Sequence, residues 1–122
     1  MIKFRSLNQN KEFLKILKKK KLNTKYFTIY FDRKIDIEKS SKNKILNISF
    51  VAKKKIGNAV KRNKIKRKLK SAVRKILTEN KQIDLNYTYV IFAKNDVYKD
   101  KFQMIFEEFN NIFKKIKKIA SK

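Results

Sequence analysis

The strongest chemical signal in this chain is a run of cationic side chains between positions 53 and 70. Guanidinium groups bind phosphate oxygens through paired hydrogen bonds, and ammonium groups attract them as mobile point charges. The chain's one glycine, Gly57, lies inside this run and is followed by Asn58, a residue type that often caps a helix. A glycine here predicts a backbone with positive φ or a close approach by another group, at a helix start whose free N–H groups attract an anion. The segment therefore predicts a phosphate-binding surface.

An amphipathic helix is expected to display these cations, because apolar residues recur among them at helical spacing. Ile65, Leu69, Ala72, Val73 and Ile76 follow one another at intervals of four, three, one and three, which places them on one stripe. A helix face that is merely solvated would show the same spacing, so this pattern alone leaves that alternative open. At about 100° per residue, the opposite side carries Asn63, Arg67, Lys70 and Arg74, while Arg62 and Lys66 flank the apolar stripe.

The charge of the whole chain favours a polyanionic partner. Its 122 residues include 35 Lys and Arg against 10 Asp and Glu, which gives a formal net charge of +25. No acidic residue occurs from Lys39 through Thr78, whereas Asp96, Asp100 and two glutamates gather near the C-terminal end. A lysine-rich genome alone would spread cations evenly along the chain. Because the charge is organised into regions, we expect the partner to be a nucleic acid.

Composition also excludes several kinds of protein. An apolar content of 42% supports one folded domain over residues 1–122 rather than a disordered tail. The chain has no Cys and no His, which removes disulfides, thiolate metal sites and the usual general base. The segment from Met1 to Leu7 lacks the apolar centre of a signal peptide, and no stretch approaches the roughly 20 apolar residues of a membrane span. We therefore expect a cytoplasmic protein with no membrane partner.

The remaining periodicities predict an α+β domain in which helices pack on a small sheet. A short amphipathic helix is expected after a cap at Asn8 or Asn10 and would end in the lysines of residues 18–21. A last helix is expected from about Asp100, with phenylalanines and isoleucines on its inner face. The predicted strands cover about residues 26–31, 45–52 and 87–93.

The first of these strands carries aromatic side chains on both faces. Alternation places Tyr26, Thr28 and Tyr30 on one face and three apolar residues on the other. The polar stretch 32–43 is expected to connect it to the next strand as a hairpin.

Residues 54–70 resemble the signature of one family, the protein component of bacterial ribonuclease P. Its elements are a pair of lysines, a Gly-Asn-Ala-Val turn, Arg-Asn, then Lys-Arg two residues later, and a further basic residue. The resemblance extends over nearly the whole chain, since family members are similarly short and basic, with an N-terminal helix that carries Phe, an aromatic-rich strand that ends in Tyr and a hydrophobic C-terminal helix. The signature appears here as Lys54-Lys55-Ile56-Gly57-Asn58-Ala59-Val60-Lys61-Arg62-Asn63-Lys64-Ile65-Lys66-Arg67, closed by Lys70.

This resemblance implies a fold and a function. The fold would be a central four-stranded sheet packed with three helices in the order α-β-β-β-α-β-α, with a left-handed β-α-β crossover around the motif. The function would be that of a protein subunit that assists a catalytic RNA in removing the 5′ leader from precursor tRNA, with Mg²⁺ held mainly by the RNA. No catalytic residue and no metal ligand is then expected on the protein itself.

The resemblance also implies two separate surfaces, one for the catalytic RNA and one for the single-stranded leader. The second would be a cleft between the first helix and the open face of the sheet, where unpaired bases stack on aromatic rings without sequence preference. The residues expected to bind the catalytic RNA or to shape its site are Lys54, Lys55, Gly57, Asn58, Arg62, Asn63, Lys66, Arg67 and Lys70, with Arg74 on the same helix face. Those expected to bind the leader are Phe13, Leu17, Tyr26, Thr28 and Tyr30.

Two of these positions depart from the family pattern. Lys70 stands where Arg is frequent, which keeps the charge but loses the two-pronged hydrogen bond. Leu17 stands where an aromatic residue is frequent, so that position offers no ring for stacking. Without the resemblance, Phe13 would be assigned to the core and Tyr30 would be an ordinary strand residue.

Of three alternative functions, two would need residue arrangements that this chain lacks, and one would fit the same composition. A ribosomal or general RNA-binding protein would show the same charge and aromatic content, and only the signature argues against it. A self-sufficient nuclease needs carboxylates that converge on metal ions, whereas the acidic residues here are few and scattered. A membrane-active cationic helix would carry Trp or Phe on its apolar face, and the basic helix has neither.

Overall fold

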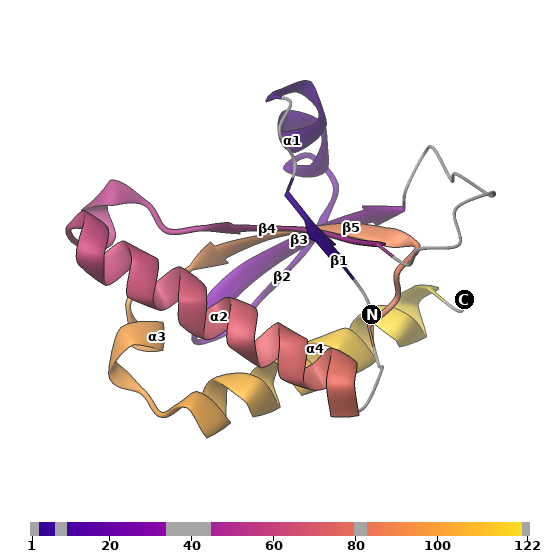
Figure 1. Cartoon of the computed structure of the whole chain (residues 1–122). Helices are drawn as coiled ribbons and strands as arrows, with labels where there is room; N and C mark the ends of the chain where they lie inside the picture. The colour runs from indigo at the N-terminus through magenta and orange to yellow at the C-terminus, as the bar shows by residue number, and fades with distance from the viewer. Residues whose placement is uncertain (1–2, 7–9, 34–44, 80–82, 121–122) are drawn as a thin grey trace.

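A mixed β-sheet forms the centre of the computed structural model, which describes residues 3–6, 10–33, 45–79 and 83–120 (Figure 1). In the described part of the chain the sheet has five strands in the order β1-β4-β5-β3-β2. β4 runs parallel to both β1 and β5, whereas β3 is antiparallel to both β5 and β2. The strands are β1 (Lys3–Arg5), β2 (Lys20–Asn23), β3 (Phe27–Arg33), β4 (Ile45–Val51) and β5 (Tyr87–Ala93).

Helices cover both faces of this sheet, which gives an α+β domain. Figure 1 shows α1 (Asn10–Ile16) standing on one face, while α2 (Ala59–Glu79) and α4 (Phe102–Ala120) lie across the other. Two short helices complete the fold: the 3₁₀ helix η1 (Lys54–Ile56) precedes α2, and α3 (Asp96–Lys99) precedes α4. We call the side with α1 the open face and the side with α2 and α4 the helix face.

The core lies between the sheet and the helix face. Phe27, Ile29 and Phe31 alternate along β3 and are buried against this layer. The ring of Phe27 stacks on that of Phe109 from α4, with the ring centroids 4.2 Å apart. Burial of each such side chain stabilises the fold by about 1.5–3 kcal/mol. The apolar stripe predicted for α2 is also buried here: Ile65, Leu69, Ala72, Val73 and Ile76.

The sheet order shows that the expected hairpin between the first two predicted strands is wrong. β5 lies between β3 and β4 and pairs with both. Alternation reveals that a segment is a strand but not which strand is its neighbour. β5 suits the central position because Val90 and Ile91, which point to opposite faces, are both fully buried. Residues 34–44, most of the expected hairpin connection, lie outside the described part of the chain.

The other differences concern short elements. Lys20 and Lys21 belong to β2 and not to the end of the first helix, and β1 was also not predicted. Both are short edge strands with two basic residues each, so neither shows the apolar alternation by which a strand is recognised. The C-terminal region contains α3 as a separate turn, and α4 starts at Phe102 instead of Asp100. The strand predicted over 87–93 is confirmed as β5.

The parallel strands β4 and β5 are adjacent and joined through α2, which makes β4-α2-β5 a crossover unit around the basic segment. This connectivity agrees with the expected β-α-β arrangement. Its left-handed sense stays a prediction.

Candidate nucleic-acid interface

The turn that precedes α2 has the geometry expected for Gly57 and Asn58. Gly57 has φ 159° and ψ −168°, a combination that is nearly restricted to glycine. A Cβ at this position would lie 2.7 Å from Cδ of Lys61. The side-chain oxygen of Asn58 accepts a hydrogen bond of 2.9 Å from the backbone N–H of Lys61, which caps α2. The positive φ and the helix cap are therefore both confirmed.

The outer side of α2 forms the surface that we call the basic face, defined by Asn63, Arg67, Lys70 and Arg74. All four side chains are exposed, as the helical spacing predicts. None of them forms an ion pair with an acidic residue in the described part of the chain. Arg74 is the most restrained, because its guanidinium lies over the ring of Phe4 at 5.1 Å from the centroid.

Arg62 and Lys66 lie beside the basic face, where they were predicted to flank the apolar stripe. Both are half-buried. Nε of Arg62 is buried and has no hydrogen-bond partner among the described residues. Lys54 and Lys55 are exposed in η1, at the turn that leads into α2. The predicted residues for the catalytic RNA are thus gathered on one side of α2 and at its N-terminal end.

Three other lysines of α2 face α3 and α4 and serve the fold. Nζ of Lys61 lies 4.9 Å from the ring centroid of Tyr98, and Nζ of Lys75 lies 4.5 Å from that of Phe106. Lys68 donates hydrogen bonds to backbone carbonyl oxygens at the end of α3. The three recur every seven residues, and this spacing is the signal that could have separated them from the basic face.

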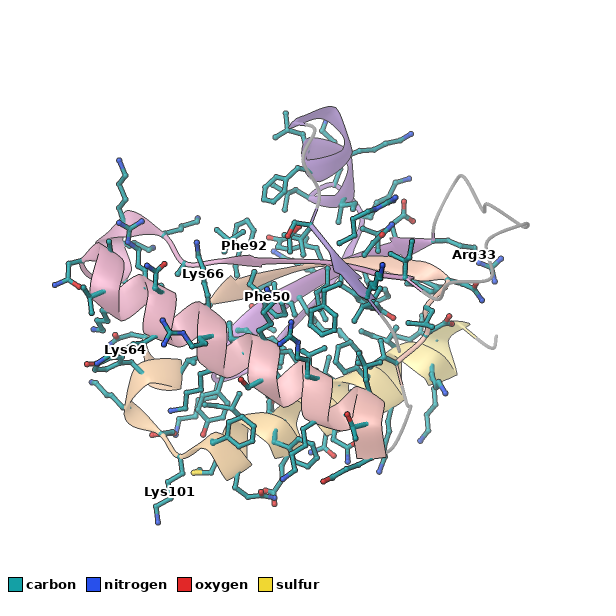
Figure 2. The ribbon with its side chains drawn as sticks, in the orientation of Figure 1. Arg33, Phe50, Lys64, Lys66, Phe92 and Lys101 are labelled. Atoms are coloured by element: carbon teal, nitrogen blue, oxygen red, sulfur yellow. The ribbon has the colours of Figure 1, made fainter. Side chains whose placement is uncertain are left out.

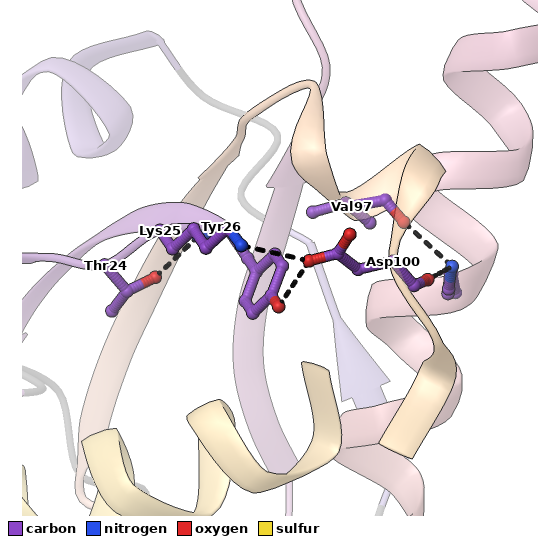
Figure 3. Close-up of polar contacts among 6 residues, drawn as sticks. Thr24, Lys25, Tyr26, Val97 and Asp100 are labelled. Atoms are coloured by element: carbon purple, nitrogen blue, oxygen red, sulfur yellow. Dashed lines mark hydrogen bonds and ion pairs between the residues drawn. The ribbon is translucent and has the colours of Figure 1, made fainter. Parts of the chain in front are cut away.

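The contacts of Lys68 belong to a group of interactions that we call the Asp100 clasp, made by Lys25, Tyr26, Lys68 and Asp100 (Figure 3). The hydroxyl of Tyr26 donates a hydrogen bond of 2.6 Å to the carboxylate of Asp100, and Nζ of Lys25 lies 3.4 Å from the same oxygen. Lys68 donates to the carbonyl oxygens of Asp100 and, at 2.8 Å, of Val97. The clasp joins the start of β3, the α3–α4 junction and α2.

Tyr26 was expected on the face of Thr28 and Tyr30, and this placement is wrong. The strand begins one residue later, at Phe27, and the Tyr26 side chain is 3% exposed within the core cluster. Its hydrogen bond to the Asp100 carboxylate raises the pKa of Tyr26 to about 12. The same bond lowers the pKa of Asp100 below its ordinary value. Tyr26 therefore anchors the start of β3 and offers no ring to the open face.

The other predicted aromatic residues do meet on the open face, around a ring that the sequence analysis missed. Phe92 of β5 lies between Phe13 of α1 and Tyr30 of β3, with centroid distances of 6.1 Å and 5.6 Å. Thr28 pairs directly with Phe92 across the sheet. We call these four residues the aromatic face. Leu17 follows the last residue of α1 and is half-buried.

Phe92 could have been found from alternation along β5. Ile91 points to the core, so Phe92 must point to the opposite face. Figure 2 shows Phe50 on the helix face and Phe92 near the opposite side of the sheet, while Lys64 on α2 points away from it. Because α2 lies on the helix face and the three rings lie on the open face, the basic face and the aromatic face are in different layers of the domain (Figure 1).

A model of one protein family, described as Ribonuclease P, matches residues 1–117 of the chain. The chain belongs to the ribonuclease P protein family. Curated relatives span its length: the ribonuclease P protein component of Mesomycoplasma hyopneumoniae (strain 7448) is 33% identical over 119 residues, which cover 97% of each chain. That of Carboxydothermus hydrogenoformans is 29% identical and covers 97% of this chain and 96% of its own.

Solved structures of ribonuclease P proteins share the fold. The Thermotoga maritima protein is 26% identical, with a TM-score of 0.65, and the match covers 91% of this chain and 96% of that one. A Staphylococcus aureus ribonuclease P protein is 22% identical with a TM-score of 0.68, and the match covers 92% and 94% of the two chains. Residues 1–117, which the family model matches, contain all five described strands, α2 and most of α4.

Among the described residues of this ribonuclease P family member, no three acidic side chains form a group that could hold a metal ion. Within the same residues, no helix is both long and apolar enough to cross a membrane.

Proposed function

We propose that this chain is the protein subunit of ribonuclease P and assists a catalytic RNA in removing the 5′ leader from precursor tRNA. The observation that carries the proposal is the basic face of α2, which is exposed and has no described acidic partner, directly after the Gly57-Asn58 turn. Cations that are not neutralised within the protein are available to phosphates, and binding them would release counterions from the RNA. Membership of the ribonuclease P family specifies which RNA this would be.

The two surfaces have different roles in this proposal. The basic face, with Arg62, Lys66 and the turn residues Lys54 and Lys55, binds the catalytic RNA. The aromatic face binds the single-stranded leader, because rings at the surface of a sheet accept unpaired bases. Phe13, Thr28 and Tyr30 support this role by their position around Phe92.

The protein contributes binding and no reacting group in this proposal. Mg²⁺ that serves the cleavage is held mainly by the RNA, since Mg²⁺ is usually bound through carboxylates or phosphates and none of the residues that define the two surfaces carries a carboxylate. The cations of the basic face hold phosphates of the catalytic RNA in place, and the rings orient the leader relative to it.

Reconstitution tests the proposal directly. The purified protein is added to a ribonuclease P RNA and precursor tRNA at moderate salt, and turnover and precursor affinity are measured with and without it. We expect the protein to raise at least one of them. No effect on either would favour the alternative of a ribosomal or general RNA-binding protein. Cleavage by the protein in the absence of RNA would contradict its non-catalytic role.

A further inference from the structure

Lys53 begins the lysine run of residues 53–55, yet its side chain belongs to the other surface. Its ammonium group lies over the ring of Phe92, with Nζ 5.2 Å from the centroid. Lys54 and Lys55 follow it directly in η1. Lys53 therefore borders the aromatic face, directly before the turn that leads into α2.

The surroundings of Lys53 are suited to a nucleotide. Its side chain is exposed, and the ring beneath it is half-buried beside Phe13 and Tyr30. A second cation borders the same rings, because Lys21 pairs with Tyr30 across the sheet and holds Nζ 5.9 Å from that ring centroid. Adjacent flat apolar surfaces and positive charges match the bases and phosphates of a single strand.

The contact between Lys53 and Phe92 can give way to a stronger one. An ammonium group that is exposed to solvent is held only weakly by a ring beneath it, whereas an ammonium group on a phosphate forms a charge-assisted hydrogen bond. The ammonium group and a stacked base cannot share the same side of the ring. Binding of a nucleotide would therefore move Lys53 from the ring to the phosphate that arrives with the base.

We propose that Lys53 and Phe92 together form one nucleotide-binding element of the leader surface. An unpaired leader base stacks on Phe92, and the Lys53 ammonium group leaves the ring and neutralises the adjoining phosphate. This element rests on the proposed function, because it needs a leader held on the open face. It adds a charged contact to a surface that otherwise binds through rings.

The test compares Lys53→Gln with Lys101→Gln in the reconstituted holoenzyme. Dissociation constants for precursor tRNA and mature tRNA are measured over a range of salt concentrations, and their ratio isolates the contribution of the leader. Lys53→Gln should lower the preference for precursor severalfold and reduce the log–log salt slope of that ratio by about 0.7, the value for one phosphate of a single strand. Lys101→Gln removes the same charge from an exposed position outside both surfaces and should leave the ratio unchanged.

A second variant separates the ring from the charge. Phe92→Leu should lower the preference for precursor about fivefold or more and leave the salt slope of the ratio as in wild type, because stacking releases no counterions. If Phe92→Leu does not fold, the measurements on Lys53→Gln still test the proposal, because Lys53 is exposed and its substitution should leave the fold intact.

The outcomes are distinguishable from failure of the proposed function itself. If the wild-type protein does not raise the activity of the RNA, the proposed function fails. If the wild-type protein does so, but Lys53→Gln keeps the wild-type ratio and slope, the Lys53 element is overturned. An equal loss of affinity for precursor and mature tRNA in Lys53→Gln would also overturn it.

Discussion

The basic face of α2 and the aromatic face of the sheet are constructed in opposite ways. The basic face comes from a single helix, its side chains are long, and most of them extend into solvent. The aromatic face combines residues of α1, β3 and β5, and the rings of Phe13 and Tyr30 both contact the ring of Phe92. A charged surface binds through counterion release and is weakened by salt, whereas stacked rings bind almost independently of salt. Measuring RNA affinity over a range of salt concentrations should therefore distinguish the contributions of the two faces.

Removal of charge from the basic face should have the largest effect. The triple variant Arg67→Gln, Lys70→Gln, Arg74→Gln should weaken binding to the catalytic RNA by about a hundredfold or more near 0.1 M salt, with a log–log slope shallower by about 2–3. The matched control changes Lys114, Lys115 and Lys117 of α4 to Gln, which removes the same charge from another exposed surface. Equal losses in both variants would mean that binding follows net charge and not the face.

Removal of a ring from the aromatic face should have the next largest effect. Tyr30→Ala should reduce the preference of the holoenzyme for precursor over mature tRNA by about 1–3 kcal/mol, with little change in its salt dependence. The control is Tyr98→Ala, because Tyr98 is an exposed tyrosine on α3 that is 45% accessible. If Tyr30→Ala instead weakened binding to the catalytic RNA alone, the separation of the two faces would be wrong.

Substitution of Gly57 should affect the basic face through the backbone. Gly57→Ala forces a residue with a Cβ into a conformation that favours glycine and should lower the free energy of unfolding by about 1–3 kcal/mol. In the folded fraction, affinity for the catalytic RNA should fall while the preference for precursor stays at the wild-type value. Chemical denaturation and the two binding assays measure these quantities. Unchanged stability would show that the turn tolerates a side chain.

The Asp100 clasp should have the smallest effect, and only on stability. The pKa of Asp100 is lower in the folded chain than in the unfolded chain, so the carboxylate adds stability at neutral pH that is lost as the pH falls below about 4. Asp100→Asn should therefore lower the melting temperature at pH 7 by a few degrees and flatten its decline in acid.

Tyr26 gives the complementary change at the alkaline end. Its pKa rises from 10.0 to about 12 on folding, so the stability it contributes is complete below pH 10 and is lost as the pH rises toward 12. Tyr26→Phe should remove this alkaline dependence and leave the preference for precursor unchanged. If Tyr26→Phe instead lost the preference for precursor and kept its stability, Tyr26 would be a leader-binding residue and not a structural one.

The sequence predicts the basic face well because one helical period determines it. Ile65 through Ile76 define the buried stripe, and every cation of α2 then has a calculable direction. The aromatic face depends on which strands are neighbours, and Phe92 reaches Tyr30 only because β5 lies between β3 and β4. Alternation along 26–31 cannot show that the chain bends at Tyr26 and turns this side chain toward Asp100. Local spacing is thus recoverable from sequence, whereas strand order and the edges of elements depend on tertiary contacts.

The central position of β5 has a consequence for synthesis of the chain. β3 and β4 are complete by residue 51, but the strand that joins them begins only at Tyr87. Until it is made, β3 and β4 each have an unpaired apolar edge, and such edges are prone to association with other chains. The five-stranded sheet can therefore be completed only after most of the chain has left the ribosome. Slow translation between α2 and β5 would prolong exposure of these edges, and a nascent chain truncated before residue 87 should aggregate.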